Sequence, residues 1–330
     1  MEIMPNRFTI SCALTTWNSN EYLEKQLDSL QNQTLPFDEV IIVDDASTND
    51  TLKRLKAYIE THHLSHWKVI EHAANQGFVA TFQDALQAAT GDLIFLCDHD
   101  DLWYPDKVQI MTQQFDLRPN LQVLACSFDL IDGQDNQIAD KVSTRRGNHN
   151  LIRKPVVHGG FTPMGLEDLT AYNFAPGCTL AFKKEIKDLY LNKAKDLDLP
   201  HDWAISVIGS LSGQLGYLDL PLIGYRQHEA NTLGLSRRNK YEARKKAAIQ
   251  EAHQKEALET LAGRFQASQV QMRTIRKTVR VYTRRAKAFE NHNPLGLMPL
   301  FFLSMPSGFK LTLGMDLKTI LESRGAKNEC

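Results

Sequence analysis

The stretch "IIVDDASTND", residues Ile41–Asp50, joins three branched apolar residues directly to two carboxylates and a polar turn. The apolar run predicts a strand over Val40–Val43. Asp44 and Asp45 then stand at the carboxyl end of that strand. Three interpretations of the paired carboxylates are open at this point: a metal site, the start of a helix, or a contact with a nucleotide.

The same alternation of strand and helix continues on both sides of this stretch. Strands are predicted at Arg7–Leu14, Trp67–Ile70 and Leu93–Cys97, with amphipathic helices between them. This alternation indicates parallel βαβ units and a doubly wound, mostly parallel α/β sheet. In such sheets ligands bind outside the carboxyl ends of the strands. The polar clusters at those ends are expected to line one crevice: Thr15–Asn18, Asp44–Thr48, His72–Gly77 and Asp98–Asp101.

Charge divides the chain into two parts. Residues 236–330 carry 19 Lys and Arg against 8 Asp and Glu, a net charge of +11, whereas the first 235 residues carry −12. We therefore predict two parts with different electrostatic roles, a domain over 1–235 and a basic, mainly helical extension over 236–330. Five scattered cysteines, no signal-like leader and no apolar run of ~20 residues indicate a cytoplasmic protein, with contact at the inner face of the plasma membrane left open.

The stretch "LIFLCDHDDLW", Leu93–Trp103, ends a predicted strand in Asp98, His99, Asp100 and Asp101. Carboxylates at that position suit Mg²⁺ or Mn²⁺, which in turn can hold a diphosphate leaving group. The plainer interpretation is that these residues are solvated loop acids that cap a helix. Similarly, Asp44 and Asp45 can accept hydrogen bonds from a nucleoside or can favour the positive end of the next helix. A phosphoryl-transfer site on a doubly wound sheet is a rival for the same pattern.

Two later segments add candidate groups. In "HDWAISV", Asp202 is a candidate general base or a simple helix cap, and Trp203 a candidate wall for a sugar ring. In "YRQHEANTLG", His228 can offer an imidazole to a metal and Arg226 can meet a phosphate, although an isolated histidine is more often structural.

Taken in order, these pieces resemble the inverting family 2 glycosyltransferases with a GT-A fold. The resemblance covers about residues 7 to 236 through "LTTWN", "QTLPFDEVIIVDDASTNDT", "NQGFVATFQDALQAATGDLIFLCDHDDLWYPDKV", "PGCTLAF" and the segment from His201 to Gly234. The Asp-His-Asp-Asp-Leu-Trp, His-Asp-Trp and Tyr-Arg-Gln-His pieces are similar to bacterial rhamnosyltransferases, which use dTDP-L-rhamnose. Trp17 stands where the family more often has Tyr, and Gln83 where it often has Asn.

The resemblance implies a role for each matched residue. Asp202 would be the catalytic base, and Asp100, Asp98 and His228 would hold Mg²⁺ or Mn²⁺. The partners implied are a nucleotide-sugar donor and a glycan or lipid-linked glycan acceptor, with no nucleic acid. UDP-glucose, UDP-galactose or a UDP-N-acetylhexosamine is the alternative donor, and a non-catalytic recruitment module is a remote alternative function. The residues expected to contact the donor are Thr15, Trp17, Asp44, Asp45, Asn75, Gly77, Asp98, Gly177, Cys178, Trp203 and Arg226.

The basic extension contains one clear amphipathic helix. Six apolar residues step by three and four along it and are flanked by arginines. This stripe has three open interpretations: contact with a membrane surface, packing on the catalytic domain, or packing on a second subunit in a homodimer. Its members are Met272, Ile275, Val279, Tyr282, Ala286 and Phe289.

Overall fold

A mixed β-sheet lies at the centre of the chain in the computed structural model, which describes residues 8–19, 21–138, 152, 154–227, 240–303 and 309–328. Within these residues the sheet has nine strands in the order β3-β2-β1-β4-β8-β6-β9-β5, and β7 pairs with β9. Strands β1 to β4 run parallel, as the alternation in the sequence predicts, whereas β8 is antiparallel to both of its neighbours. The strands are β1 (Ile10–Thr16), β2 (Glu39–Asp44), β3 (Trp67–Glu71), β4 (Leu93–Cys97), β5 (Leu102–Trp103), β6 (Val123–Ile131), β7 (Phe161–Met164), β8 (Leu180–Lys183) and β9 (Leu215–Arg226).

Helices cover both faces of the sheet, because alternate residues of the buried strands point to opposite faces. Cys12 and Ile42 contribute to one apolar cluster with α1, α2 and α4, while Ala13 and Ile41 contribute to another with α3, α6 and α7. The helices are α1 (Leu23–Gln31), α2 (Thr51–Thr61), α3 (Phe78–Ala88), α4 (Lys107–Leu117), α5 (Leu166–Leu169), α6 (Lys184–Lys193) and α7 (His201–Leu211), with a short 3₁₀ turn η1 (Gly177–Thr179).

The register of the parallel strands brings their carboxyl ends together. Thr16 of β1 is opposite Asp44 of β2, and Leu14 of β1 is opposite Cys97 of β4. The polar residues that follow these strands therefore emerge along one edge of the sheet. This edge is where the sequence predicts that the four polar clusters meet.

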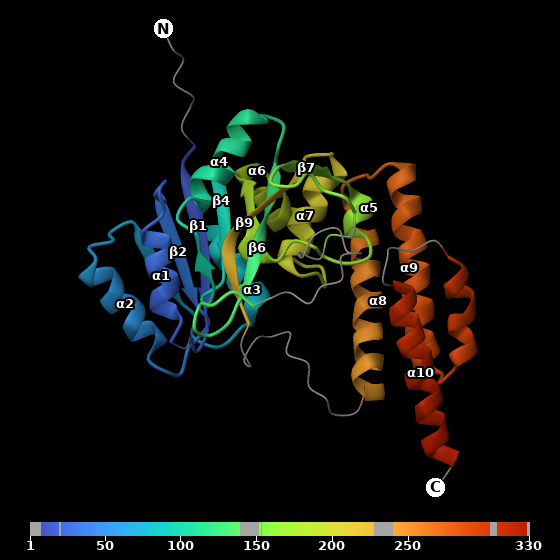
Figure 1. Cartoon of the computed structure of the whole chain (residues 1–330). Coiled ribbons are helices and arrows are strands. Elements are labelled where there is room, and N and C mark those ends of the chain that lie inside the picture. The colour runs from blue at the N-terminus through green and yellow to red at the C-terminus, as the bar shows by residue number, and fades with distance from the viewer. Residues whose placement is uncertain are drawn as a thin grey trace.

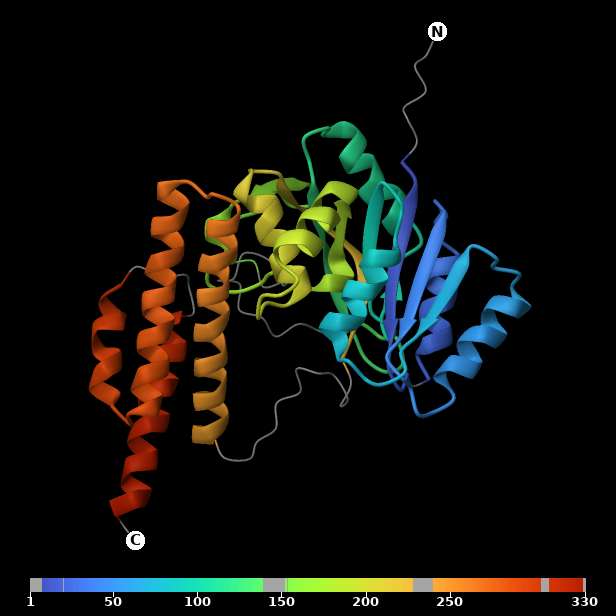
Figure 2. The ribbon, with the colours of Figure 1, turned by 180° about the vertical axis from the view of Figure 1, so that it is seen from behind.

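The chain ends in helices α8 (Lys240–Arg264), α9 (Gln269–Glu290) and α10 (Phe309–Asn328), with the 3₁₀ segment η2 (Pro294–Phe302) between the last two. Figure 1 and Figure 2 show them side by side, with α8 nearest to the sheet and its helices. The predicted apolar stripe of α9 faces inward: Ile275, Tyr282 and Phe289 are buried. The structure thus favours packing within the chain for that stripe. In the described part of the chain, no helix has the length and apolar character needed to cross a bilayer.

Candidate active site

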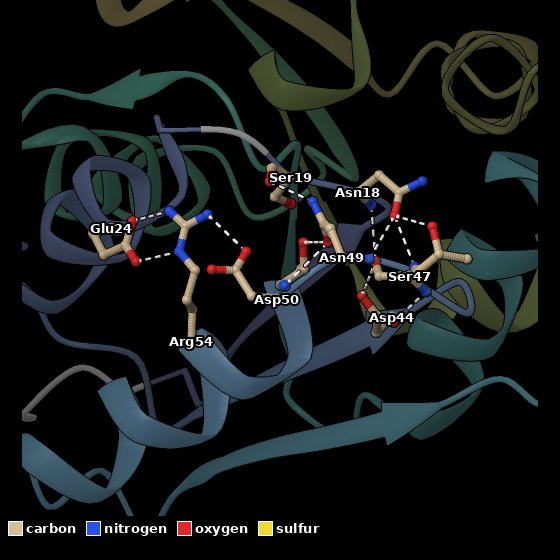
Figure 3. A network of polar contacts seen from close by, with 10 residues as sticks. Asn18, Ser19, Glu24, Asp44, Ser47, Asn49, Asp50 and Arg54 are labelled. Carbon is tan, nitrogen blue, oxygen red and sulfur yellow. Dashed lines mark hydrogen bonds and ion pairs between the residues drawn. The ribbon is translucent and has the colours of Figure 1, made fainter.

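Asp44, at the end of β2, lies in a network that joins the ends of β1 and β2 (Figure 3). Its carboxylate accepts hydrogen bonds from Thr16 Oγ1 at 2.8 Å and from the backbone N–H and hydroxyl of Ser47 at 2.9 and 2.6 Å. Ser47 Oγ in turn accepts from the backbone N–H of Asn18 at 2.8 Å. The loop after β2 is thereby fixed against the loop after β1. Since a carboxylate offers about four lone-pair sites, Asp44 keeps capacity for one further donor.

Asp45 has a different environment from its neighbour. Its oxygens accept the backbone N–H groups of Gln76 and Gly77 at 2.7 and 2.8 Å and contact His72 Nδ1 at 2.8 Å. The other ring nitrogen of His72 lies 2.9 Å from Asp84. Burial opposes charge on Asp45, but these hydrogen bonds outweigh it and lower the pKa of the carboxyl. Asp45 therefore fastens the 72–77 loop, with Gly77 at a φ of +84°, in the left-handed region that favours glycine.

The loop after β4 brings two carboxylates, Asp98 and Asp101, next to Cys178 of the η1 turn. Asp98, Asp101 and Cys178 bring one potential ligand atom each to within 4.8 Å of one another. Lys107 is a buried cation beside them: its Nζ donates to the carbonyl of Cys178 at 2.5 Å and lies 3.3 Å from the ring centroid of Trp103. The charge of Lys107 lowers the pKa of Asp98, but burial and the neighbouring carboxylates have the larger effect. Burial and the charges of Asp101, Asp100 and Asp202 raise the pKa of Asp98 well above its usual value.

This donor set fits a hard divalent cation. Burial and the charge of Asp100 also raise the pKa of Asp101, to about 7. A bound cation would relieve the repulsion, and carboxylate oxygens are the ligands that Mg²⁺ and Mn²⁺ prefer. Burial raises the pKa of the Cys178 thiol well above its ordinary value, so at neutral pH the sulfur is protonated and a poor ligand. His228, the third predicted ligand, lies outside the described residues.

Arg226, at the end of β9, is fully buried and holds the acidic loop in place. Its backbone N–H donates to Asp101 Oδ1 at 3.0 Å, and its Nε donates to the carbonyl of Asp100 at 2.7 Å. Nη1 donates to the carbonyl of Asp132 at 2.8 Å and forms an ion pair with Asp135 at 2.5 Å. The guanidinium also lies over the ring of Tyr22. A side chain held in this way positions the turn at Asp100 and Asp101 and is not placed to contact a phosphate, the role predicted for it from the sequence.

Asp202 is the second residue of helix α7 and lies next to Gly177 of the η1 turn. Its carboxylate accepts the backbone N–H of Trp203 at 2.7 Å, and a Cβ added at Gly177 would lie 3.7 Å from its Cβ. Burial raises the pKa of Asp202 to about 6, against the lowering effect of hydrogen bonds from Trp203, Gly177 and Asn173. The adjacent His201 is buried, and burial lowers its pKa to about 3, so it adds no positive charge. Asp202 thus has the character of a general base that ionises just below neutral pH.

Trp203, by contrast, belongs to the core. It is 4% exposed, its Nε1 donates to the carbonyl of Leu169 at 3.0 Å, and Lys255 Nζ of α8 lies 3.9 Å from its ring centroid. The stacking wall for a sugar that the sequence suggested does not fit this position. Trp17, which is 53% exposed beside the Asp44 network, offers an exposed aromatic ring for stacking.

Three residues at or near the site were not singled out from the sequence. Asp101 lies within the acidic motif, but nothing in the motif distinguishes it from Asp100. Lys107 and Lys255 lie within helices, and only the fold brings them against Trp103 and Trp203. Their burial has no signal in a single sequence.

Comparison with known proteins identifies a family model and several relatives that match this chain. The profile "Glycosyl transferase family 2" matches residues 11–184, which is more than half of the chain. An uncharacterized glycosyltransferase of Nostoc sp. is 29% identical over 74% of this chain and 73% of its own length. The dTDP-rhamnosyl transferase RfbG of Shigella flexneri is 27% identical over 67% of this chain and 73% of its own length.

Two solved structures share the fold at low sequence identity. Residues 1–349 of TarS from S. aureus, in complex with UDP-GlcNAc, align with a TM-score of 0.56 and 19% identity, over 96% of this chain and 92% of that one. The mannosyltransferase PcManGT from Pyrobaculum calidifontis, in complex with GDP-Man and Mn²⁺, aligns with a TM-score of 0.54 and 17% identity, over 96% and 87%. Together with the mixed sheet, these matches show the GT-A fold that the sequence predicts.

Proposed function

The chain belongs to glycosyl transferase family 2, and on that premise we propose that it is a metal-dependent inverting enzyme that uses a nucleotide-diphosphate sugar as donor. The observation that carries this proposal is a group of carboxylates that meet at the η1 turn and raise one another's pKa. Asp98 and Asp101 lie against Cys178 of the turn, while Asp202 lies against Gly177. One-step displacement needs both functions at one site, with the leaving diphosphate held at one face of the sugar and the base at the other.

In the proposed reaction, Asp202 accepts the proton of an acceptor hydroxyl as the hydroxyl oxygen attacks the anomeric carbon of the donor sugar. The bond between that carbon and the diphosphate oxygen breaks, and the nucleoside diphosphate leaves from the opposite face. Asp98 and Asp100, with Asp101 beside them, would hold Mg²⁺ or Mn²⁺. When bound, the cation would neutralise charge that develops on the leaving diphosphate. The Mn²⁺ in the PcManGT structure supports this choice of metal.

The nucleoside would bind along the edge formed by the ends of β1 and β2. Asp44 has one acceptor site left for a base or ribose N–H or O–H group, and Trp17 offers an exposed ring for stacking. Thr15 lies at the end of β1, and Asn75 and Gly77 lie in the loop that Asp45 fastens. Asp45 itself is committed to that loop, so its effect on the donor would be indirect.

For the donor we propose dTDP-L-rhamnose, and for the acceptor a hydroxyl of a bacterial surface glycan or lipid-linked glycan at the cytoplasmic face of the membrane. The likeness to RfbG supports rhamnose, whereas UDP-GlcNAc in the TarS structure keeps a UDP-sugar as the alternative. Titration of the purified protein with dTDP-L-rhamnose, UDP-glucose and UDP-GlcNAc, each with and without Mn²⁺, tests the proposal. Metal-dependent binding of dTDP-L-rhamnose alone supports it; binding of a UDP-sugar alone would overturn the donor, and binding of none of them would overturn the function.

A further inference from the structure

The outer surface of helix α9 carries a row of cations with no acidic residue in the row. Arg273, Lys277, Arg280, Arg284 and Lys287 are exposed and step by four, three, four and three, so they share one face of the helix. At 1.5 Å per residue this row is about 21 Å long. It lies opposite the buried stripe that contains Ile275 and Tyr282. We refer to these five residues as the cationic row.

An exposed apolar ridge lies directly beside the cationic row. In η2 the side chains of Pro294, Leu297 and Leu300 repeat every three residues and are buried, as a 3₁₀ helix requires for one face. The two other rows of η2 carry exposed apolar side chains: Leu295 and Met298 on one row are 74% and 44% exposed, and Phe302 on the next row is 85% exposed.

Contacts between the two elements fix them as one surface. Arg284 Nε in the cationic row donates to the carbonyl of Gly296 in η2 at 2.9 Å. Behind them, Val281 and Ala288 of α9 share an apolar cluster with Leu297 and Leu300 of η2. Both views place this segment on the side of α9 that faces away from the sheet (Figures 1 and 2).

From this surface we propose that the cationic row and the ridge of Leu295, Met298 and Phe302 bind the surface of a bilayer that contains anionic lipid. A flat row of cations matches a plane of anionic headgroups, and three protruding apolar side chains reach the boundary between headgroups and acyl chains. The apolar segment is short and broken by Pro299, so it suits shallow insertion. The surface differs from the apolar stripe of α9, which packs inside the chain. The inference deepens the proposed function, on which it rests for its purpose, because a lipid-linked acceptor would be held at the same membrane.

Co-sedimentation of the full chain with vesicles tests the inference. We expect the protein to sediment with vesicles of phosphatidylcholine and phosphatidylglycerol, to bind phosphatidylcholine vesicles at least tenfold more weakly, and to be released by salt. The double variant Leu295→Ser with Phe302→Ser should reduce binding to the anionic vesicles at least fivefold. The double variant Arg273→Gln with Arg280→Gln should reduce both the binding and its dependence on salt. All four side chains are exposed, so thermal unfolding should be unchanged.

Matched controls are available elsewhere on the surface. Leu117→Ser removes an apolar side chain of α4 that is 71% exposed. Lys53→Gln with Lys184→Gln removes two exposed cations, one of α2 and one of α6. Both controls should bind as the unaltered protein does. The inference would be overturned if the wild-type protein stayed in the supernatant or if the variants bound vesicles normally. It would also be overturned if the wild-type protein sedimented without vesicles and the same variants abolished this sedimentation, because the surface would then bind a second copy of the chain. Donor binding, measured separately in the same samples, reports on the proposed function independently.

Discussion

Replacement of Asp202 by Asn tests the catalytic base most directly. Asn keeps the shape of the side chain, and its amide oxygen can still accept the backbone N–H of Trp203. It cannot take a proton from the acceptor, so we expect the rate of transfer to fall by about 10²–10⁴-fold, the usual contribution of a general base. Donor binding should be kept, because the substitution leaves in place the residues that we propose to contact the donor and the cation.

The same substitution should stabilise the fold. Burial raises the pKa of Asp202 from the ordinary 3.8 to about 6, so the charged form is disfavoured in the native state. Each pKa unit is worth about 1.4 kcal/mol, so the cost above pH 6 is at most about 3 kcal/mol, and less because the side chain keeps some contact with solvent. The sign follows from proton binding: between about pH 4 and 6 the native protein binds more protons at this site than the unfolded chain. As the pH rises from about 4 to 6, the contribution of Asp202 to the free energy of unfolding therefore falls. The stabilisation by Asp202→Asn appears above about pH 6.

Two measurements check this reasoning. Initial rates of transfer with a saturating acceptor should fall tenfold per pH unit below about pH 6 in the wild type, because the base becomes protonated. Urea unfolding at about pH 4 and pH 8 should show the stabilisation of Asp202→Asn only at the higher pH. Asp198→Asn, an exposed substitution four residues earlier, is the control and should leave both measurements unchanged. Normal transfer by Asp202→Asn would refute the assignment of the base.

Three further substitutions separate the other parts of the site. Asp44→Ala should weaken donor binding and leave Mn²⁺ binding intact in calorimetric titrations; equal donor affinity would return Asp44 to a purely structural role in its loop. Arg226→Met should cost about 3 kcal/mol in urea unfolding, since it removes a buried guanidinium that Asp135 and two carbonyls hold, and it should weaken Mn²⁺ binding. Arg54→Met, at a more exposed pair with Glu24, should cost under about 1 kcal/mol. Equal losses for the two arginines would contradict the positioning role. Burial lowers the pKa of Lys255 to about 7, so between about pH 7 and 10.5 the unfolded chain binds more protons and stability rises with pH. Lys255→Met should therefore raise the melting temperature more at about pH 6 than at pH 10. An equal effect at the two pH values would contradict the burial of the Lys255 charge.

Most of the parallel half of the sheet could be predicted from the sequence, because its strands are continuous apolar runs and its ends are marked by polar turns. The predicted strands over Val40–Val43 and Leu93–Cys97 agree with β2 and β4 within a residue or so. The antiparallel strands β5 and β7 were not predicted, since two or four residues carry too little periodicity. Their positions depend on pairing with β9, more than 50 residues further along the chain.

Long-range contacts limited the prediction of the site in the same way. Arg226 could be singled out from its polar surroundings, but its role depends on Asp101, 125 residues away. The stripe on α9 was visible as an apolar periodicity, yet periodicity does not say what covers an apolar face. In the structure the stripe of α9 packs in apolar clusters with residues of α8 and α7, whereas Leu295, Met298 and Phe302 of η2 are exposed.

Adjacent residues at this site have different roles, because successive side chains point in different directions after a strand or at a helix start. In the pair Asp44 and Asp45, the second carboxylate is committed to Gln76, Gly77 and His72, whereas the first keeps an acceptor site. The pair Asp202 and Trp203 follows the same rule, because Trp203 is fixed in the core. In the proposed roles, each pair combines one residue that acts on a ligand with one residue that anchors the surrounding structure. Substitution of Asp45 or Trp203 should lower stability as well as activity, whereas Asp202→Asn should lower activity while it stabilises the fold.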